Sequence, residues 1–136
     1  MKRLQRPGGT PPPAEATLDG TRIDLAAAAE EVARRYFGEF PEDRESYSPE
    51  VWDWAVHDTR YLLSWGVGDL SGFRMLDPQV DWLARVLAAR GFPLERLARN
   101  LELTAEALAE LAPDRRERIE ALYAAAAARC RASGPR

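Results

Sequence analysis

Leucine recurs at helical spacing through the stretch between Pro93 and Pro113. The leucines lie three, four or seven residues apart, with alanines on the neighbouring line: Leu94, Leu97, Leu101, Leu108 and Leu111, beside Ala98, Ala105 and Ala112. This spacing places apolar side chains on one side of an α-helix, close to a heptad seam. Such a helix is stable in water only when its apolar side packs against other elements. The stretch therefore predicts the core of a helical protein, as one helix or as two segments that meet near Thr104.

Capping residues, prolines and glycines predict four more helices. Their expected ranges are 22–37 with Thr21 as cap, 49–65 after Ser48, 78–90 after Asp77, and a last helix opened by Pro113, with Ile119, Leu122, Tyr123 and Ala126 inward and Arg115, Arg116 and Arg118 outward. Glycine at positions 66, 68 and 72 predicts a loop after the second of these helices. Glycine at position 91 is expected to end the third in a left-handed conformation.

No segment alternates between apolar and polar residues in the manner of a strand, so the expected fold class is all-α. The length of 136 residues fits one domain. We expect a single bundle of about five helices. Residues 1–20 are expected to form a flexible Pro/Gly-rich tail, residues 21–130 the helical domain, and residues 131–136 a disordered C-terminus.

The scarcity of histidine and cysteine excludes several kinds of chemistry. One His and one Cys cannot supply the four ligands of a structural zinc site, and one Cys cannot form an internal disulfide. We therefore expect no metal and no cofactor. A net charge of -3 makes nucleic acid an unlikely partner. No apolar window is long enough for a membrane helix, and the N-terminus lacks the apolar part of a signal peptide, so a cytoplasmic location is expected.

Charge is unevenly distributed along the sequence. Residues 39–53 contain six acidic residues against Arg44, whereas residues 113–136 contain six arginines against three acidic residues. These two segments could meet within the fold or between chains. Exposed pairs of this kind contribute about 0–1 kcal/mol each.

Several short patterns between residues 50 and 112 resemble one family. They are Asp58-Thr59-Arg60-Tyr61-Leu62-Leu63, Gly68-Asp69, Trp82-Leu83 and the run from Val86 to Glu95. The chain resembles the globin-like, phycobiliprotein-like helical domains of bacterial sensory proteins. The resemblance implies globin-like helix packing and a sensory or partner-binding role. The segment 51–57 lacks the Cys that carries bilin in such relatives, and His57 is poorly placed as a haem ligand, so the resemblance implies no bound cofactor here.

Aromatic residues are concentrated in the first half of the chain. Eight of the twelve lie between Tyr36 and Trp65. Tryptophan and tyrosine combine a large apolar surface with a polar group, which suits pockets and interfaces. Trp52 and Trp54 are two residues apart and cannot share a helix face, so at least one is expected to be exposed or to face a partner. The candidate ligand- or partner-binding residues are Trp52, Trp54, His57, Arg60, Tyr61, Trp65 and Trp82.

These features favour a non-catalytic sensory or adaptor domain that binds a partner protein or a small ligand, and a homodimer is possible. One alternative is a helix-turn-helix regulator that uses residues 93–111. Against it, Glu102 occupies the tight-turn position, and the second helix would present Glu106 and Glu110 to phosphates. A second alternative is a small helical enzyme built on carboxylates and His57, although no catalytic residue can be assigned.

Overall fold

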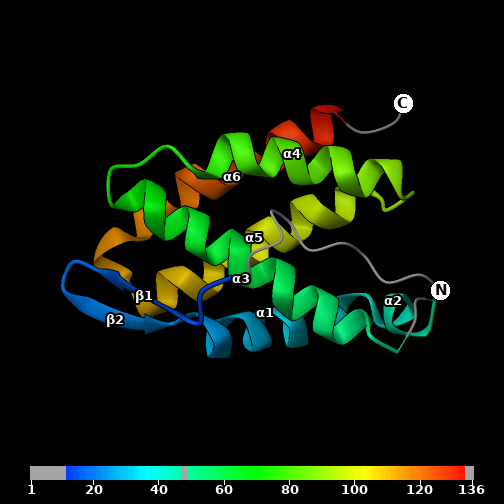
Figure 1. The fold of residues 1–136 in the computed structure, drawn as a ribbon, viewed down its shortest axis with the longest axis horizontal. Helices are drawn as coiled ribbons and strands as arrows, with labels where there is room; N and C mark the ends of the chain where they lie inside the picture. The colour runs from blue at the N-terminus through cyan, green and yellow to red at the C-terminus, as the bar shows by residue number, and fades with distance from the viewer. Residues whose placement is uncertain (1–11, 47–48, 134–136) are drawn as a thin grey trace.

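The computed structural model describes residues 12–46 and 49–133 (Figure 1). Its elements follow the chain as β1 (Glu15–Leu18), β2 (Thr21–Asp24), α1 (Leu25–Glu39), α2 (Pro41–Ser46), α3 (Val51–Leu70), α4 (Leu76–Ala89), α5 (Leu94–Leu111), the short 3-10 helix η2 (Pro113–Arg115) and α6 (Arg116–Ser133). In the described part, the only strands are those of one two-stranded hairpin. The expectation of an all-α bundle is confirmed.

Helix α5 lies at the centre of the bundle. It packs most extensively against α6 and also contacts α1, α3 and α4. Figure 1 shows α3 and α5 between α1 on one side and α4 on the other. The α5 residues Ala98, Leu101 and Leu108 are completely buried. The predicted leucine stripe therefore lies in the core, except for Leu111 at the end of α5, which is exposed.

Helix α5 is continuous, so the one-helix alternative is correct and the helix-turn-helix interpretation of residues 93–111 is wrong. Thr104 does not cap a second helix. Its buried hydroxyl donates a 2.7 Å hydrogen bond to the backbone carbonyl of Asn100, one turn earlier in the same helix. This local bond satisfies a polar group inside the core without interrupting the helix.

The glycines of α3 do not end that helix. The predicted loop after residue 65 is wrong up to residue 70, because α3 continues through Gly66 and Gly68 to Leu70. A Cβ atom on Gly66 would overlap the phenol of Tyr123 on α6, and one on Gly68 would overlap the side chain of Met75. Both positions are small because other segments approach the helix there.

The start of α4 is also set differently from the prediction. Asp69 near the end of α3 accepts hydrogen bonds from the backbone amides of Met75 (3.2 Å) and Leu76 (2.6 Å). Helix α4 therefore begins before the expected Asp77 and Pro78. Its end agrees with the prediction, since Gly91 follows the helix with a φ of 79°.

The N-terminal part of the described chain is a hairpin rather than a tail. Asp19 (φ 52°) and Gly20 (φ 80°) form its two-residue turn, which requires two positive φ angles. Leu18 and Ile23 are buried in the core. The first helix consequently begins at Leu25, not near residue 22. Its cap is Asp24, which accepts a 2.9 Å hydrogen bond from the amide of Ala27, and not Thr21.

The remaining boundary predictions fall partly outside the described residues. These are the tail before residue 12, the cap at Ser48 and the C-terminus beyond residue 133. Helix α3 begins at Val51 rather than at Pro49, and α6 extends to Ser133, past the expected boundary at residue 130. The inward positions predicted for the last helix are correct, because Ile119, Leu122, Tyr123 and Ala126 are all buried. Of the three arginines expected outward, Arg116 and Arg118 are exposed and Arg115 is half-buried.

Within the described ranges, no helix is long and apolar enough to span a bilayer.

Candidate functional site

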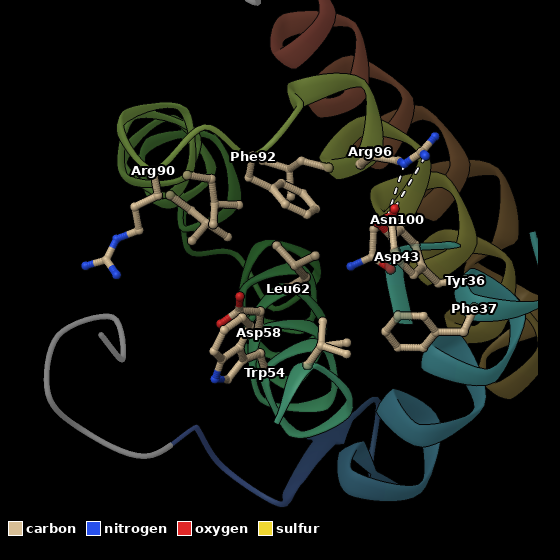
Figure 2. A pocket seen from close by; sticks show the side chains of 15 residues that line it. Tyr36, Phe37, Asp43, Trp54, Asp58, Leu62, Arg90, Phe92, Arg96 and Asn100 are labelled. Atoms are coloured by element: carbon tan, nitrogen blue, oxygen red, sulfur yellow. Dashed lines mark hydrogen bonds and ion pairs between the residues drawn. The ribbon is translucent and has the colours of Figure 1, made fainter. Parts of the chain in front are cut away.

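A cavity of about 100 Å³ lies between α3, α4 and α5, and is closed on one side by α1 and α2 (Figure 2). It is lined by Tyr36, Phe37, Asp43, Val51, Trp54, Ala55, Asp58, Leu62, Leu83, Leu87, Arg90, Phe92, Arg96, Leu97 and Asn100. The five α3 residues of this set follow helical spacing and so lie along one face of the helix. The cavity is therefore formed where a single face of α3 meets four other helices and the turn before α5.

Most of the cavity wall is apolar. Trp54 is buried, with 9% of its surface exposed, and Leu62, Leu83 and Leu87 are buried beside it. Phe92, which follows α4, and Phe37 of α1 add two more aromatic rings to the wall. A wall of this composition, with few polar groups, is typical of small-molecule sites.

Asp58 places a carboxylate on this mainly apolar wall. Its side chain is 23% exposed, and its Oδ1 atom lies 3.3 Å from Nδ1 of the adjacent His57. Burial raises the pKa of Asp58, and the contact with His57 opposes that rise only in part. In the described part of the chain, no arginine or lysine forms an ion pair with this carboxylate.

The second carboxylate of the cavity, Asp43, is fully engaged. Its Oδ2 atom accepts hydrogen bonds from the hydroxyl of Tyr36 and, at 3.2 Å, from Nε of Arg96. Arg96 also bonds Glu42 at 3.1 Å and lies 3.9 Å from the centroid of the Phe40 ring. Figure 2 shows this group at the side of the cavity opposite Asp58. Asp43 thus carries a charge that the fold itself neutralises.

Two ring nitrogens near Asp58 have no hydrogen-bond partner. Nε1 of Trp54 and Nε2 of His57 are buried and unbonded in the described structure. A buried polar group without a partner costs about 1–3 kcal/mol. Asn100, by contrast, is held in place because its amide donates a 3.2 Å hydrogen bond to Thr59. Of the two residues with an unbonded ring nitrogen, only Trp54 lines the cavity.

The seven residues predicted from the sequence do not form one site. Only Trp54 lines the cavity. His57, Tyr61 and Trp65 lie along another line of α3. The His57 ring meets Tyr61 edge to face, with centroids 5.2 Å apart, and Tyr61 stacks on Trp65 at 5.4 Å. Arg60 donates hydrogen bonds to the backbone carbonyls of Pro12 and Pro13.

The two other predicted tryptophans lie apart from the cavity. Trp82 is half-buried against the main core. Trp52 is also half-buried, and the Arg44 guanidinium lies 5.0 Å from its ring centroid. Neither Trp52 nor Trp54 is exposed, so that part of the expectation is wrong, while a contact of one of them with a partner stays a prediction. The large apolar side chains that are exposed among the described residues are Phe73 (66%) and Leu111 (50%).

Within the described residues, the acidic segment 39–53 forms no ion pair with the basic C-terminal segment. The acidic segment pairs with α5 instead: Arg96 binds Glu42 and Asp43, and Arg99 binds Glu39 at 2.6 Å. Arg96 and Arg99, which lie within the segment 93–111 of the helix-turn-helix alternative, are thus engaged by carboxylates. Among the described residues, no cluster of three or more His, Cys, Asp or Glu side chains is arranged to hold a metal ion.

The fold and the cavity define the class: a helical-bundle protein with a small, mainly apolar pocket between its helices. Comparison of the chain with protein families, with curated proteins and with solved structures found no match.

Proposed function

We propose that this chain is a non-catalytic sensory domain that binds a small molecule in the cavity between α3, α4 and α5. The observation that carries the proposal is the combination of an apolar cavity of about 100 Å³ with a carboxylate on its wall, that of Asp58, whose one recorded partner in the described structure is His57. A bound molecule would supply contacts that the protein lacks on its own.

The residues of the wall favour binding over catalysis. The set includes no Ser, Cys, Lys or His, although it does include two Asp side chains. One of these, Asp43, is held by Arg96 and Tyr36. Asp58 alone provides no pair of groups for nucleophilic or acid–base chemistry of the usual kinds.

The position of the cavity suits a sensory role. Its wall is built from α1, α2, α3, α4 and α5, so a ligand there would contact most helices of the bundle at once. A ligand that favours one arrangement of these helices would shift the population toward that arrangement. The resemblance to bacterial helical sensory domains supports the same proposal.

The test compares ligand binding with the cavity open and filled. A library of molecules with about six non-hydrogen atoms, the size that fits a cavity of this order, is screened by thermal unfolding and tryptophan fluorescence. At a ligand concentration 100-fold above its Kd, binding raises the free energy of unfolding by about 2.7 kcal/mol. Ala55→Phe places a ring in the cavity and should abolish the effect.

The matched control is Ala88→Phe, which makes the same change at an exposed position of α4 outside the cavity. This control should keep wild-type binding. The proposal is overturned if no library member binds, or if Ala55→Phe binds ligands as well as the control does.

A further inference from the structure

We propose that the cavity selects a small organic cation: an ammonium group that contacts the Asp58 carboxylate, attached to an apolar body that packs against Trp54 and Phe92. This inference rests on the proposed function and names the class of ligand. It follows from three properties of the cavity, namely its charges, its aromatic wall and its size.

The charges of the wall leave a single negative group to be neutralised. Asp43 is neutralised by Arg96. Arg90 is exposed, and Figure 2 shows its guanidinium pointing away from the cavity. Asp58 remains, with His57 as its one recorded partner in the described structure, at 3.3 Å. A cationic ligand would pair with this carboxylate, whereas an anionic ligand would be repelled by it.

The surroundings of Asp58 penalise its charge in the empty protein. Burial raises the pKa of this carboxyl group, which means that the empty cavity favours the neutral form. An ammonium group would stabilise the ionised form of Asp58, because it supplies both a positive charge and hydrogen-bond donors. A neutral alcohol would supply a donor without the charge.

The aromatic wall favours the same class of ligand. Trp54, Phe37 and Phe92 present rings to the cavity, and the faces of aromatic rings attract cations. The rings also match the apolar body that such a ligand would carry. A cavity of 150 Å³ holds benzene, so about 100 Å³ limits the body to about five carbon atoms.

Three ligands with one branched carbon skeleton test the charge preference: isoamylamine, isoamyl alcohol and isovalerate. At pH 7 they are a cation, a neutral molecule and an anion. Titration calorimetry and ligand-observed NMR should show that the amine binds at least about tenfold more tightly than the alcohol, since a hydrogen bond to a charged group is stronger than a neutral one. Isovalerate should not bind measurably.

Asp58→Asn keeps the size of the side chain and removes its charge. It should weaken amine binding by about tenfold or more and leave alcohol binding within about twofold. The matched control is Asp53→Asn, an exposed position on the same helix that does not line the cavity. Asp58→Ser makes the same test if the asparagine variant unfolds below the assay temperature.

The outcomes separate this inference from the proposed function. If the alcohol or isovalerate binds more tightly than the amine, or if Asp58→Asn binds the amine as the wild type does, the inference is overturned while the pocket remains a ligand site. If none of the three binds but a member of the library binds the wild-type protein, the inference alone is overturned. If none of the three binds and no member of the library binds the wild-type protein either, the proposed function itself is overturned.

Discussion

The hydroxyl of Tyr123 on α6 donates a 2.6 Å hydrogen bond to the backbone carbonyl of Leu62 on α3. The phenol can reach this carbonyl because Gly66, one turn further along α3, has no side chain. Tyr123 is completely buried, and burial raises the pKa of its hydroxyl, with a smaller contribution from Asp69. The tyrosine therefore stays a neutral hydrogen-bond donor.

Gly66→Ala should destabilise the protein even though alanine is the better helix former. The added methyl group would overlap a buried, rigid ring, and overpacking of this kind costs about 1–3 kcal/mol. Gly68→Ala is the comparison, because its added methyl group would meet the flexible end of Met75. Urea unfolding should show a larger loss of unfolding free energy for Gly66→Ala than for Gly68→Ala. Equal losses would contradict the packing described for Tyr123.

Tyr123→Phe should lower the free energy of unfolding by about 1 kcal/mol, since it removes one buried hydrogen bond while keeping the ring. Removal of the hydroxyl should also relieve part of the overlap in Gly66→Ala. The double variant should therefore lose less unfolding free energy than the two single variants lose together. Such coupling is expected of residues in contact. A double-mutant cycle by chemical denaturation measures it, and strict additivity would argue against the contact.

Asp58→Asn should stabilise the empty protein at neutral pH, because asparagine fills the same position without the free-energy cost of burying a charge. The pKa of Asp58 is higher in the folded protein than its ordinary value of 3.8, so the folded state binds more protons there than the unfolded state. Its contribution to stability therefore falls as the pH rises from about 4 through the folded pKa. The difference in unfolding free energy between Asp58→Asn and the wild type should grow over that window and then level off.

The other charged groups of this region must be considered in that experiment. His57 precedes Asp58 on α3, while Asp43 of α2, Arg90 after α4 and Arg96 of α5 line the same cavity, as does the Tyr36 hydroxyl of α1. Because the variant and the wild type share these groups, the difference between them isolates Asp58. If the difference in unfolding free energy does not change with pH, the pKa of Asp58 is not raised in the folded protein.

Arg99→Gln should destabilise the protein by about 1 kcal/mol or less, because its ion pairs are partly exposed. The hydrogen bond from Arg99 lowers the pKa of Glu39, so this stabilisation is present above pH 4.5 and is lost as the pH falls through the lowered value. Molar salt should shrink the effect. Arg85→Gln, at an exposed position of α4, is the control. Equal losses of thermal stability in the two variants would contradict a stabilising role for the ion pairs of Arg99.

Cys130 should react slowly with thiol reagents in the native protein. Its side chain is buried, and burial raises the pKa of the thiol to about 11, so the reactive thiolate is scarce at pH 8. Modification by a disulfide reagent should follow unfolding of α6. A native rate close to that in denaturant would show that this helix is open in solution.

The sequence predicts the helices better than the site. Helical spacing identifies the core faces of α5 and α6 because those faces pack within the bundle by the same periodicity. The glycines of α3 mislead because their reason lies in Tyr123 and Met75, which come from other segments. The hairpin is hidden in the sequence because its Asp19-Gly20 turn lies in a segment whose many prolines and glycines predict a tail.

The cavity could be anticipated only in part. Trp54, Asp58 and Leu62 lie four residues apart, so a charged residue stands between two apolar ones on a single helix face. That pattern is a usable signal for a carboxylate in an apolar setting. The opposite wall comes from α2, α5 and the turn before α5, and periodicity within one helix carries no information about such contacts.

A cavity of about 100 Å³ also has a mechanical consequence. Empty interior volume is lost when a protein unfolds, so hydrostatic pressure favours the unfolded state in proportion to such volume. The part of the cavity that is closed to solvent would therefore make the bundle sensitive to pressure where α3 meets α4 and α5. A molecule that fills the cavity would make the protein less compressible at that single point.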